Sequence, residues 1–292
     1  MKYMNEKKVG VGTVMVVGAG TMGHGIAQAA AMAGFRTWMY DLEESLLERA
    51  RSHVEKNLKK GKELGKISEE VFQAGRENLL TTTDFEKAAS ECDFLIEAVP
   101  EKIELKMEIF HRSEQLCKEE TVLATNTSSL SITEIAAAVE NPQRVIGMHF
   151  FNPVHIMKLV EIVRAPQTDQ ATFDITEAVA HKMGKETVDV KESPGFVTSR
   201  INAMIGNEAF YMLQEGIASA RDIDKAIKLG LNHPMGPFEM IDLVGLDTRL
   251  SVLEFLHQRL GDKYRPCPLL VKYVKAGRLG RKVGKGVYEY ES

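Results

Sequence analysis

Cysteine is scarce in this sequence, with three residues among 292. Cys92, Cys117 and Cys267 are odd in number and widely separated, and no two of them form a Cys-x-x-Cys pair. This spacing argues against a disulfide scaffold and against a zinc site, so we expect no bound metal. It is typical of proteins from a reducing compartment, and we expect a cytoplasmic protein.

Long hydrophobic runs and an excess of one charge are also missing. No stretch approaches 18 uncharged apolar residues, and residues 1–10 lack the apolar core of a secretory signal, so we expect no membrane segment and no signal peptide. The 37 basic and 41 acidic residues leave a net charge of −4. That balance gives no electrostatic reason to expect nucleic acid or an anionic membrane surface as a partner.

Short apolar runs alternate with helical patterns through the first two thirds of the chain. The expected strands are 13–17, 37–40, 94–98, 122–125, 145–150, 159–163 and 187–190, with helices at 22–33 and 44–60. This alternation predicts an α/β fold with a doubly wound, mostly parallel sheet covered on both faces. A length of 292 residues favours two domains, and we assign the sheet to residues 1–192.

Beyond residue 190 the pattern becomes helical. The polar segment 191–195 is predicted to be a linker in which Ser193 caps a helix that begins near Pro194. The following pattern, 196–214, carries apolar residues on more than one face, which favours an all-helical domain at 193–292 that forms a homodimer. Further helices are expected at 222–229 and 248–260.

A Gly-x-Gly-x-x-Gly pattern lies between the first expected strand and the first expected helix. Gly18 permits the tight turn, Gly20 lets the backbone approach a pyrophosphate, and Gly23 allows close packing of helix on strand. The helix N-terminus, with Thr21 and Met22, would present N–H groups to the phosphates. The context predicts a Rossmann-type dinucleotide site.

Asp41 ends the second expected strand, 18 residues after the last glycine of the motif. A carboxylate there can accept hydrogen bonds from a ribose 2′-hydroxyl and would repel a 2′-phosphate, which favours NAD over NADP. Two alternatives stay open at this point. One is FAD, and the other is an ordinary glycine turn in which Asp41 caps a helix from Leu42 onward.

Polar residues interrupt the later strands. Asn126 and Ser128 follow one strand, His149 ends another, and Glu161 lies within an otherwise apolar strand. A hairpin turning near residues 152–153 would bring His149 and Glu161 together, and a carboxylate beside a histidine favours a base that takes up a proton. Ser128 could bind a substrate oxygen, so hydride transfer from a secondary alcohol is the expected chemistry. A structural His–Glu pair and an ordinary polar loop are the competing interpretations.

Several motifs in combination resemble the L-3-hydroxyacyl-CoA dehydrogenase family. The match runs from about residue 11 to residue 290, and the sequence is most similar to the stand-alone bacterial 3-hydroxybutyryl-CoA dehydrogenases. The motifs are the segments 17–28, 126–130, 149–154 with 158–161, 193–197 and 233–242.

The resemblance implies a role for each of the chemical residues. His149 would be the base that removes the 3-hydroxyl proton, Glu161 would orient it, and Ser128 would bind the 3-oxygen. Glu101 and Lys106 match positions that contact the nicotinamide and its ribose, and Asn126 is likewise expected to bind the cofactor. As bare sequence, Glu101 and Lys106 would instead be solvated charges at a helix start.

The resemblance also implies a binding site for the acyl-CoA substrate. Lys56 and Lys60 lie four residues apart on one helix face and match residues that meet the CoA phosphates. A solvated lysine face is the alternative. Where the family usually has a substrate-binding asparagine, this chain has Ser199, so either Ser199 makes a reduced contact or Asn202 replaces it.

We therefore expect an NAD-dependent oxidoreductase that interconverts (S)-3-hydroxyacyl-CoA and 3-ketoacyl-CoA, with short chains such as 3-hydroxybutyryl-CoA and acetoacetyl-CoA as substrates. A dehydrogenase of a free hydroxy acid, of the gulonate or carnitine type, is one alternative. A nucleotide-binding or structural homologue without catalysis is another.

Overall fold

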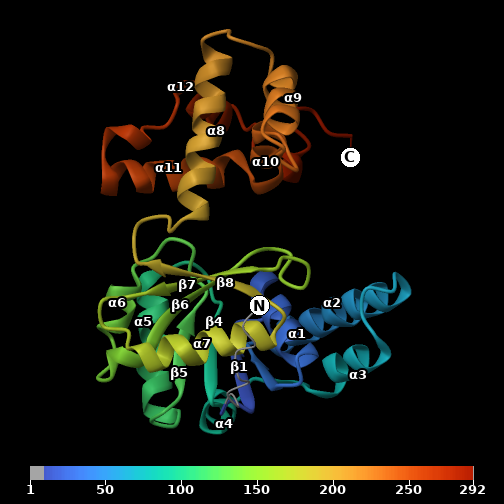
Figure 1. The fold of residues 1–292 in the computed structure, drawn as a ribbon, viewed down its shortest axis with the longest axis vertical. Helices are drawn as coiled ribbons and strands as arrows, with labels where there is room; N and C mark the ends of the chain where they lie inside the picture. The colour runs from blue at the N-terminus through green and yellow to red at the C-terminus, as the bar shows by residue number, and fades with distance from the viewer. Residues whose placement is uncertain (1–9, 292) are drawn as a thin grey trace, which may run out of the picture. The chain divides into compact units, whose positions relative to one another are not determined.

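The computed structural model describes residues 10–291 and divides the chain into two compact units, Met1–Glu192 and Ser193–Ser292 (Figure 1). The division falls within the segment 191–195 that the sequence predicts to be a linker. The N-terminal segment, for which we expect no signal peptide, lies outside the described residues except for Gly10. Among residues 10–291, no helix is both long and apolar enough to cross a membrane.

The first unit is built on one eight-stranded sheet with the spatial order β3-β2-β1-β4-β5-β6-β7-β8. All neighbouring strands are parallel except β6 and β7, which run antiparallel. The fold prediction is confirmed. The strands are β1 (Thr13–Val17), β2 (Arg36–Tyr40), β3 (Leu79–Thr82), β4 (Phe94–Glu97), β5 (Val122–Thr125), β6 (Val145–Phe150), β7 (Leu159–Arg164) and β8 (Glu186–Lys191).

Helices cover both faces of this sheet (Figure 1). They are α1 (Thr21–Met32), α2 (Glu44–Glu63), α3 (Glu69–Glu77), α4 (Phe85–Glu91), α5 (Ile103–Leu116), α6 (Ile132–Ala136) and α7 (Gln170–Lys182). Helix α1 packs closely because its inner face is small: Ala27, Ala30 and Ala31 have no exposed surface. The apolar strands β1, β4 and β5 are buried along almost their whole length, as expected for strands covered on both sides.

The strand order changes direction between β1 and β4. From β1 the chain adds β2 and β3 on one side, and from β4 it adds the later strands on the other. In open parallel sheets, ligands bind beyond the carboxyl ends of the strands at such a switch point. Gly18 follows β1, Ala98 follows β4, and Asn126 follows β5, so three of the polar or glycine-rich segments share that edge.

The second unit is helical and has a core of its own. Its helices are α8 (Thr198–Gln214), α9 (Ala220–Gly230), α10 (Pro237–Val244), α11 (Leu246–Leu260) and α12 (Pro268–Lys275). Phe210 of α8 has no exposed surface and meets Phe238 of α10 and Tyr273 of α12 edge to face. Asp224 and Asp242 tie the C-terminal segment to this core, because each accepts hydrogen bonds from it.

The predicted start of the first helix of this unit is wrong. The helix begins at Thr198 with Val197 at its N-cap, and Ser193 does not cap it. The reason is the backbone: Gly195 and Phe196 have φ values of 75° and 48°, so the chain turns through left-handed conformations before it can enter a helix. The sequence patterns did not predict strand β3 or helices α3 to α7, α10 and α12.

Candidate functional site

The turn from β1 to α1 requires glycine at two of its three motif positions. Gly18 has φ = 102°, and a Cβ there would lie 2.8 Å from the carbonyl oxygen of Ala98. A Cβ on Gly23 would overlap the carbonyl oxygen of Gly18. Gly20 differs, because a Cβ there would meet nothing within 4 Å. The open space beside Gly20 is what a pyrophosphate approaching the backbone needs.

A pocket of about 660 Å³ opens beyond this turn. Gly18, Gly20, Thr21 and Met22 line one side of it, and Asp41 lines another. No side chain caps the first turn of α1, so its N–H groups and the positive end of the helix dipole face the region of the motif. The residues present therefore fit a dinucleotide.

Asp41 is held in place by the turn itself. One carboxylate oxygen accepts a hydrogen bond from the N–H of Ala19 at 2.7 Å, and the other accepts one from the N–H of Leu42 at 2.7 Å. The alternative in which Asp41 caps the next helix is wrong, because α2 begins at Glu44 with Glu43 at its N-cap. The carboxylate is thus fixed at the pocket, as a ribose acceptor must be.

The far wall of the pocket comes from α4 and α5. Phe85 is the first residue of α4, and the guanidinium of Arg112 on α5 lies 4.3 Å from the centre of its ring. Leu105 and Ile109 of α5 complete an apolar surface. An apolar wall with an aromatic ring suits contact with a nucleotide base.

His149 and Glu161 face each other across the antiparallel strands β6 and β7. They are register partners, and Nδ1 of His149 lies 2.7 Å from Oε2 of Glu161. Glu161 has no exposed surface and His149 is 7% exposed. A buried carboxylate at Nδ1 fixes the ring orientation and the tautomer, and it stabilises an imidazolium once a proton arrives at Nε2. The two residues that the sequence predicted to form a hairpin pair are therefore in contact.

The loop after β5 is anchored to the same region. The N–H of Asn126 donates to the carbonyl of Glu97 at 2.8 Å, and its side-chain oxygen accepts from the N–H of Phe150 at 2.9 Å. Phe150 follows His149 directly, so Asn126 ties the loop carrying Ser128 to the end of β6. The side-chain oxygen of Asn126 is committed to this bond. A cofactor contact by Asn126 stays a prediction.

Glu101 gathers the following residues of that loop around one carboxylate oxygen. This oxygen accepts from the Thr127 hydroxyl at 2.5 Å, from the N–H of Ser128 at 3.0 Å and from the N–H of Ser129 at 3.2 Å. Burial would raise the pKa of Glu101, but the charge of Lys106 and these hydrogen bonds outweigh it, and the pKa lies below its ordinary value. Glu101 is therefore ionised at neutral pH and holds Ser128 by its backbone.

Lys106 is not a solvated charge, contrary to the alternative left open by the sequence. Its side chain is 1% exposed, and its ammonium lies 2.7 and 2.9 Å from the two carboxylate oxygens of Glu97. It also lies 3.4 Å from Glu101 and 3.3 Å from the carbonyl of Val99. The three ammonium donors of Lys106 thus have acceptors within the protein, and a direct contact with a cofactor stays a prediction.

Sequence reasoning missed Glu97. This carboxylate has no exposed surface and accepts from Lys106, from the N–H of Val99 at 2.6 Å and from the hydroxyl of Thr125 at 2.6 Å. It therefore joins β4, β5 and α5 at the edge of the sheet where the loop of Ser128 begins. The sequence does carry a signal for this residue: Glu97 ends the apolar strand 94–97, much as Asn126 and His149 stand at the ends of other strands.

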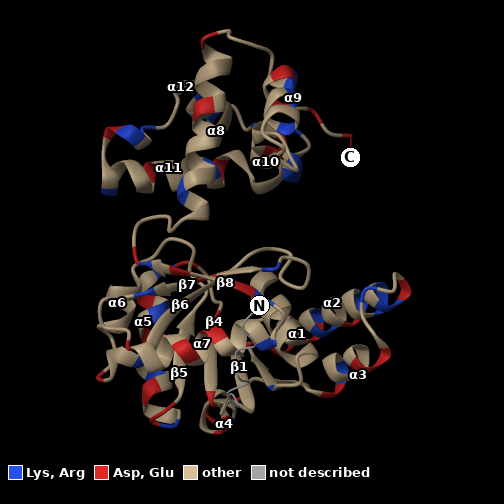
Figure 2. Ribbon diagram, in the orientation of Figure 1, with Lys and Arg blue, Asp and Glu red and all other residues tan. Residues whose placement is uncertain are grey.

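Lys56 and Lys60 are exposed on α2, whose C-terminal half is rich in basic residues (Figure 2). Their neighbours are paired: Lys59 lies 3.3 Å from Glu55, and Lys62 lies 2.6 Å from Glu69. Within residues 10–291, Lys56 and Lys60 have no carboxylate within ion-pair distance. Two unneutralised ammonium groups on one helix face are what an anionic ligand needs, and the assignment to CoA stays a prediction.

Ser199 and Asn202 both lie on α8 of the second unit, at its start. Ser199 is half-buried and Asn202 is half-buried as well. Which of them contacts the substrate stays a prediction.

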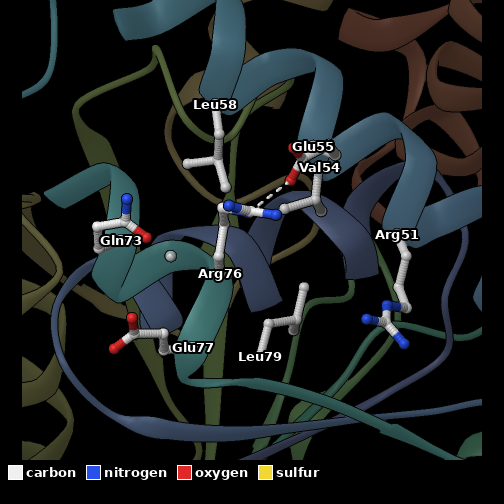
Figure 3. Close-up of a pocket in the computed structure, with 9 residues that line it drawn as sticks. Arg51, Val54, Glu55, Leu58, Gln73, Arg76, Glu77 and Leu79 are labelled. Atoms are coloured by element: carbon white, nitrogen blue, oxygen red, sulfur yellow. Dashed lines mark hydrogen bonds and ion pairs between the residues drawn. The ribbon is translucent and has the colours of Figure 1, made fainter. Parts of the chain in front are cut away.

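A second pocket, of about 310 Å³, lies between α2, α3 and β3 (Figure 3). Glu55 and Arg76 point toward each other across it and pair at 3.1 Å, so its central charges are already neutralised. None of the predicted site residues lines it. We assign it no part in the chemistry.

Comparison with known proteins matches both units to one family. Residues 13–193 match the model described as 3-hydroxyacyl-CoA dehydrogenase, NAD binding domain, and residues 195–290 match the C-terminal domain of the same family. The chain is 49% identical over 279 residues to a probable 3-hydroxybutyryl-CoA dehydrogenase of Bacillus subtilis, covering 95% of this chain and 97% of that protein. It is 44% identical to the 3-hydroxybutyryl-CoA dehydrogenase of Clostridioides difficile over 94% of this chain and 98% of that one.

A solved structure agrees with these sequence matches. The crystal structure of (S)-3-hydroxybutyryl-CoA dehydrogenase from Ralstonia eutropha superposes with a TM-score of 0.93 at 42% identity, covering 97% of this chain and 100% of that chain.

The turn predicts opposite outcomes for two glycine substitutions. Gly23→Ala places a methyl group against the carbonyl of Gly18 and should lower the melting temperature by several degrees. Gly20→Ala fits the extended backbone at φ = −66° and should leave the melting temperature unchanged while weakening NADH binding about tenfold or more, because its methyl group fills the approach to the pyrophosphate. Thermal unfolding and NADH fluorescence titration measure the two effects. Equal NADH affinity for wild type and Gly20→Ala would contradict the assignment of the pyrophosphate site.

The Glu97 network makes a second prediction. Glu97→Gln removes the nearer carboxylate partner of the buried Lys106 ammonium and leaves only Glu101, at 3.4 Å, which should destabilise the fold by about 3 kcal/mol and weaken NADH binding, since the edge of the sheet where the loop of Ser128 begins loses support. Glu104→Gln, an exposed carboxylate in the first turn of the same helix, is the matched control and should change neither quantity. If both variants unfold at the wild-type temperature, Glu97 does not hold this edge of the sheet together.

Proposed function

Because the chain belongs to the 3-hydroxyacyl-CoA dehydrogenase family, we propose that it interconverts (S)-3-hydroxyacyl-CoA and 3-ketoacyl-CoA with NAD, and that 3-hydroxybutyryl-CoA and acetoacetyl-CoA are its preferred substrates. The contact of His149 with the buried carboxylate of Glu161 carries the proposal, since it supplies a base of fixed orientation at the sheet edge that also bears the nucleotide motif. The relatives named as 3-hydroxybutyryl-CoA dehydrogenases support the four-carbon substrate.

We assign the proton chemistry to His149. In the oxidative direction Nε2 takes the proton of the substrate 3-hydroxyl, while the Nδ1 proton remains in the hydrogen bond to Glu161. The negative charge of Glu161 stabilises the imidazolium that results, and in the reductive direction the same imidazolium returns the proton to the 3-oxygen. Bound NAD would accept or donate the hydride at the nicotinamide.

Ser128 has a positioning and hydrogen-bonding role in this scheme. Its backbone N–H is held by Glu101 at 3.0 Å, and the hydroxyl lies 3.4 Å from the same oxygen, which is a weak interaction that a substrate oxygen can replace. A hydroxyl held in this way donates to the 3-oxygen as negative charge develops there.

Asp41 supports NAD rather than NADP. Both of its oxygens already accept backbone N–H groups, so the charge is fixed and cannot swing away from a 2′-phosphate. Lys56 and Lys60 would bind the phosphates of CoA. A free hydroxy acid of the gulonate or carnitine type lacks these phosphates, so this contact would favour a CoA thioester as substrate.

We further propose that the protein acts as a homodimer through its helical unit. Of thirteen exposed large apolar residues within 10–291, eight lie in that unit, although it contributes about a third of the chain. Those eight are Val197, Ile201, Ile217, Leu229, Leu231, Leu243, Val244 and Val283. Apolar surface of this extent supports an interface between protein molecules.

We also propose a metabolic role for the reaction. It serves fatty-acid β-oxidation in the oxidative direction and butyrate-type synthesis in the reductive direction.

The assay that tests the activity follows NADH oxidation with acetoacetyl-CoA, free acetoacetate and longer 3-ketoacyl-CoA esters. We expect turnover with the CoA esters, fastest with acetoacetyl-CoA, and little with free acetoacetate. His149→Ala should lower kcat about 100- to 10,000-fold without changing NADH binding, since it removes the general base. Turnover by His149→Ala at the wild-type rate would exclude His149 as the base, and faster turnover of free acetoacetate would favour the hydroxy-acid alternative.

The CoA contact is tested by charge reversal. The double variant Lys56→Glu, Lys60→Glu should raise KM for acetoacetyl-CoA about tenfold or more at low salt, with kcat and KM for NADH nearly unchanged, because the lost contacts bind phosphates remote from the reacting carbon. Lys59→Glu with Lys66→Glu changes the net charge equally on exposed lysines of the same region and serves as the control. Equal increases in KM for both double variants would reduce the role of Lys56 and Lys60 to general electrostatics.

A further inference from the structure

Two cysteines that are 25 positions apart in the sequence meet at the edge of the sheet opposite the nucleotide motif. Cys92 is the C-cap of α4 and Cys117 is the C-cap of α5. Their Sγ atoms lie 3.7 Å apart. Cys92 has no exposed surface, whereas Cys117 is partly exposed, so Cys117 is the residue of the pair that reaches the protein surface.

The segments around both thiols are fixed to each other. The ammonium of Lys118 lies 2.6 Å from the carboxylate of Asp93 and 3.3 Å from the carbonyl of Glu91. The hydroxyl of Thr121 donates to the carbonyl of Cys92 at 3.0 Å. These bonds connect the residues just before and after Cys92 with those just after Cys117. The two sulfur atoms are therefore held near each other by the fold rather than meeting by chance fluctuation.

The environment also divides the roles of the two thiols. A hydrogen bond from Cys92, together with the charges of Arg144 and Lys118, outweighs the effect of burial and lowers the pKa of the Cys117 thiol. The same hydrogen bond and burial raise the pKa of Cys92. Cys117 is accordingly the thiol that ionises first, and a thiolate is the reactive form towards peroxides.

We propose that Cys92 and Cys117 are a redox-sensitive dithiol that a hydroperoxide converts reversibly into an intramolecular disulfide. The Cys117 thiolate attacks the peroxide oxygen, the O–O bond breaks, and Cys117 becomes a sulfenic acid while the hydroperoxide is reduced to an alcohol, or to water if it is hydrogen peroxide. The sulfur of Cys92 then attacks the sulfur of Cys117, its proton leaves with the sulfenic hydroxyl as water, and the S–S bond forms. A thiol reductant returns both residues to thiols.

The position of the pair couples this chemistry to the cofactor pocket, a step that depends on the proposed function. Helices α4 and α5, which the disulfide would join, pack against each other and supply Phe85 and Arg112 to the pocket wall. A disulfide requires a sulfur separation of about 2.0 Å, so the two sulfur atoms must approach each other from the present 3.7 Å and shift the side chains at the two helix ends. A pocket complementary to its ligand in the dithiol form should bind that ligand less tightly after such a shift.

The experiment treats wild type, Cys92→Ser, Cys117→Ser and Cys267→Ser with hydrogen peroxide and analyses each by intact mass and by peptide mapping without reductant. Wild type and Cys267→Ser should lose about 2 Da, yield a peptide linking Cys92 to Cys117 and recover on addition of dithiothreitol. Cys92→Ser should gain about 16 or 32 Da at Cys117, because the sulfenic acid has no second thiol to attack it. Absence of the linked peptide from oxidised wild type, or equal oxidation of Cys267, would overturn the proposal.

NADH titration of the same samples tests the coupling. Oxidised wild type should bind NADH severalfold more weakly than the reduced protein, and Cys92→Ser should bind it equally before and after peroxide treatment. A linked peptide with unchanged NADH affinity would overturn the coupling to the pocket. Failure of the reduced protein to bind NADH would count against the proposed function instead, since disulfide formation is read by mass and does not depend on the cofactor.

Discussion

Two carboxylates without any exposed surface, Glu97 and Glu161, govern the architecture of the site. A charge removed from water is tolerated only beside a partner, and in this sheet each partner is itself part of the functional edge. Glu161 takes His149 from the neighbouring strand. Glu97 takes Lys106, which in turn lies beside Glu101 and the loop of Ser128. Removing either carboxylate would leave a buried cation or an unsupported imidazole, so neither position tolerates an apolar replacement.

The antiparallel strand β7 is what makes the first of these pairs possible. In the parallel part of the sheet, crossover helices separate consecutive strands, and residues of one strand meet those of another element far along the chain. Between β6 and β7 the chain instead turns back at once, so residues 12 apart become direct partners. Because paired residues in adjacent strands project to the same face, a histidine and a glutamate at matched positions must meet. The single reversal of strand direction thus brings His149 and Glu161 into contact.

This local origin explains which parts of the site could be predicted from sequence. The His149–Glu161 contact depends on one turn and on strand alternation, and the glycine turn depends on backbone requirements that only glycine meets, so both are readable from short segments. The role of Glu97 depends on Thr125 and Lys106, which arrive from other elements. The sequence marks Glu97 as a polar residue at the end of an apolar strand, but nothing in the segment 94–97 identifies Thr125 or Lys106 as its partner. The predicted start of α8 was wrong for a related reason. Serine is a common N-cap residue, but the left-handed backbone at Gly195 and Phe196 moves the start of the helix beyond Ser193 to Thr198.

The proposed ligands are anionic, so their binding depends on the charges close to the site rather than on the net charge of the chain. A dinucleotide and a CoA thioester both carry phosphates, yet the chain has a net charge of −4. The net charge therefore gives no overall attraction, and we expect binding to rest on groups within a Debye length of each phosphate. The uncapped N-terminus of α1 supplies partial positive charge without a formal charge. Within residues 10–291, Glu55 and Glu69 neutralise Lys59 and Lys62, whereas Lys56 and Lys60 have no carboxylate within ion-pair distance. In the proposed site, selectivity for anions would arise from the lysines that lack a carboxylate partner, a property that the net charge does not report.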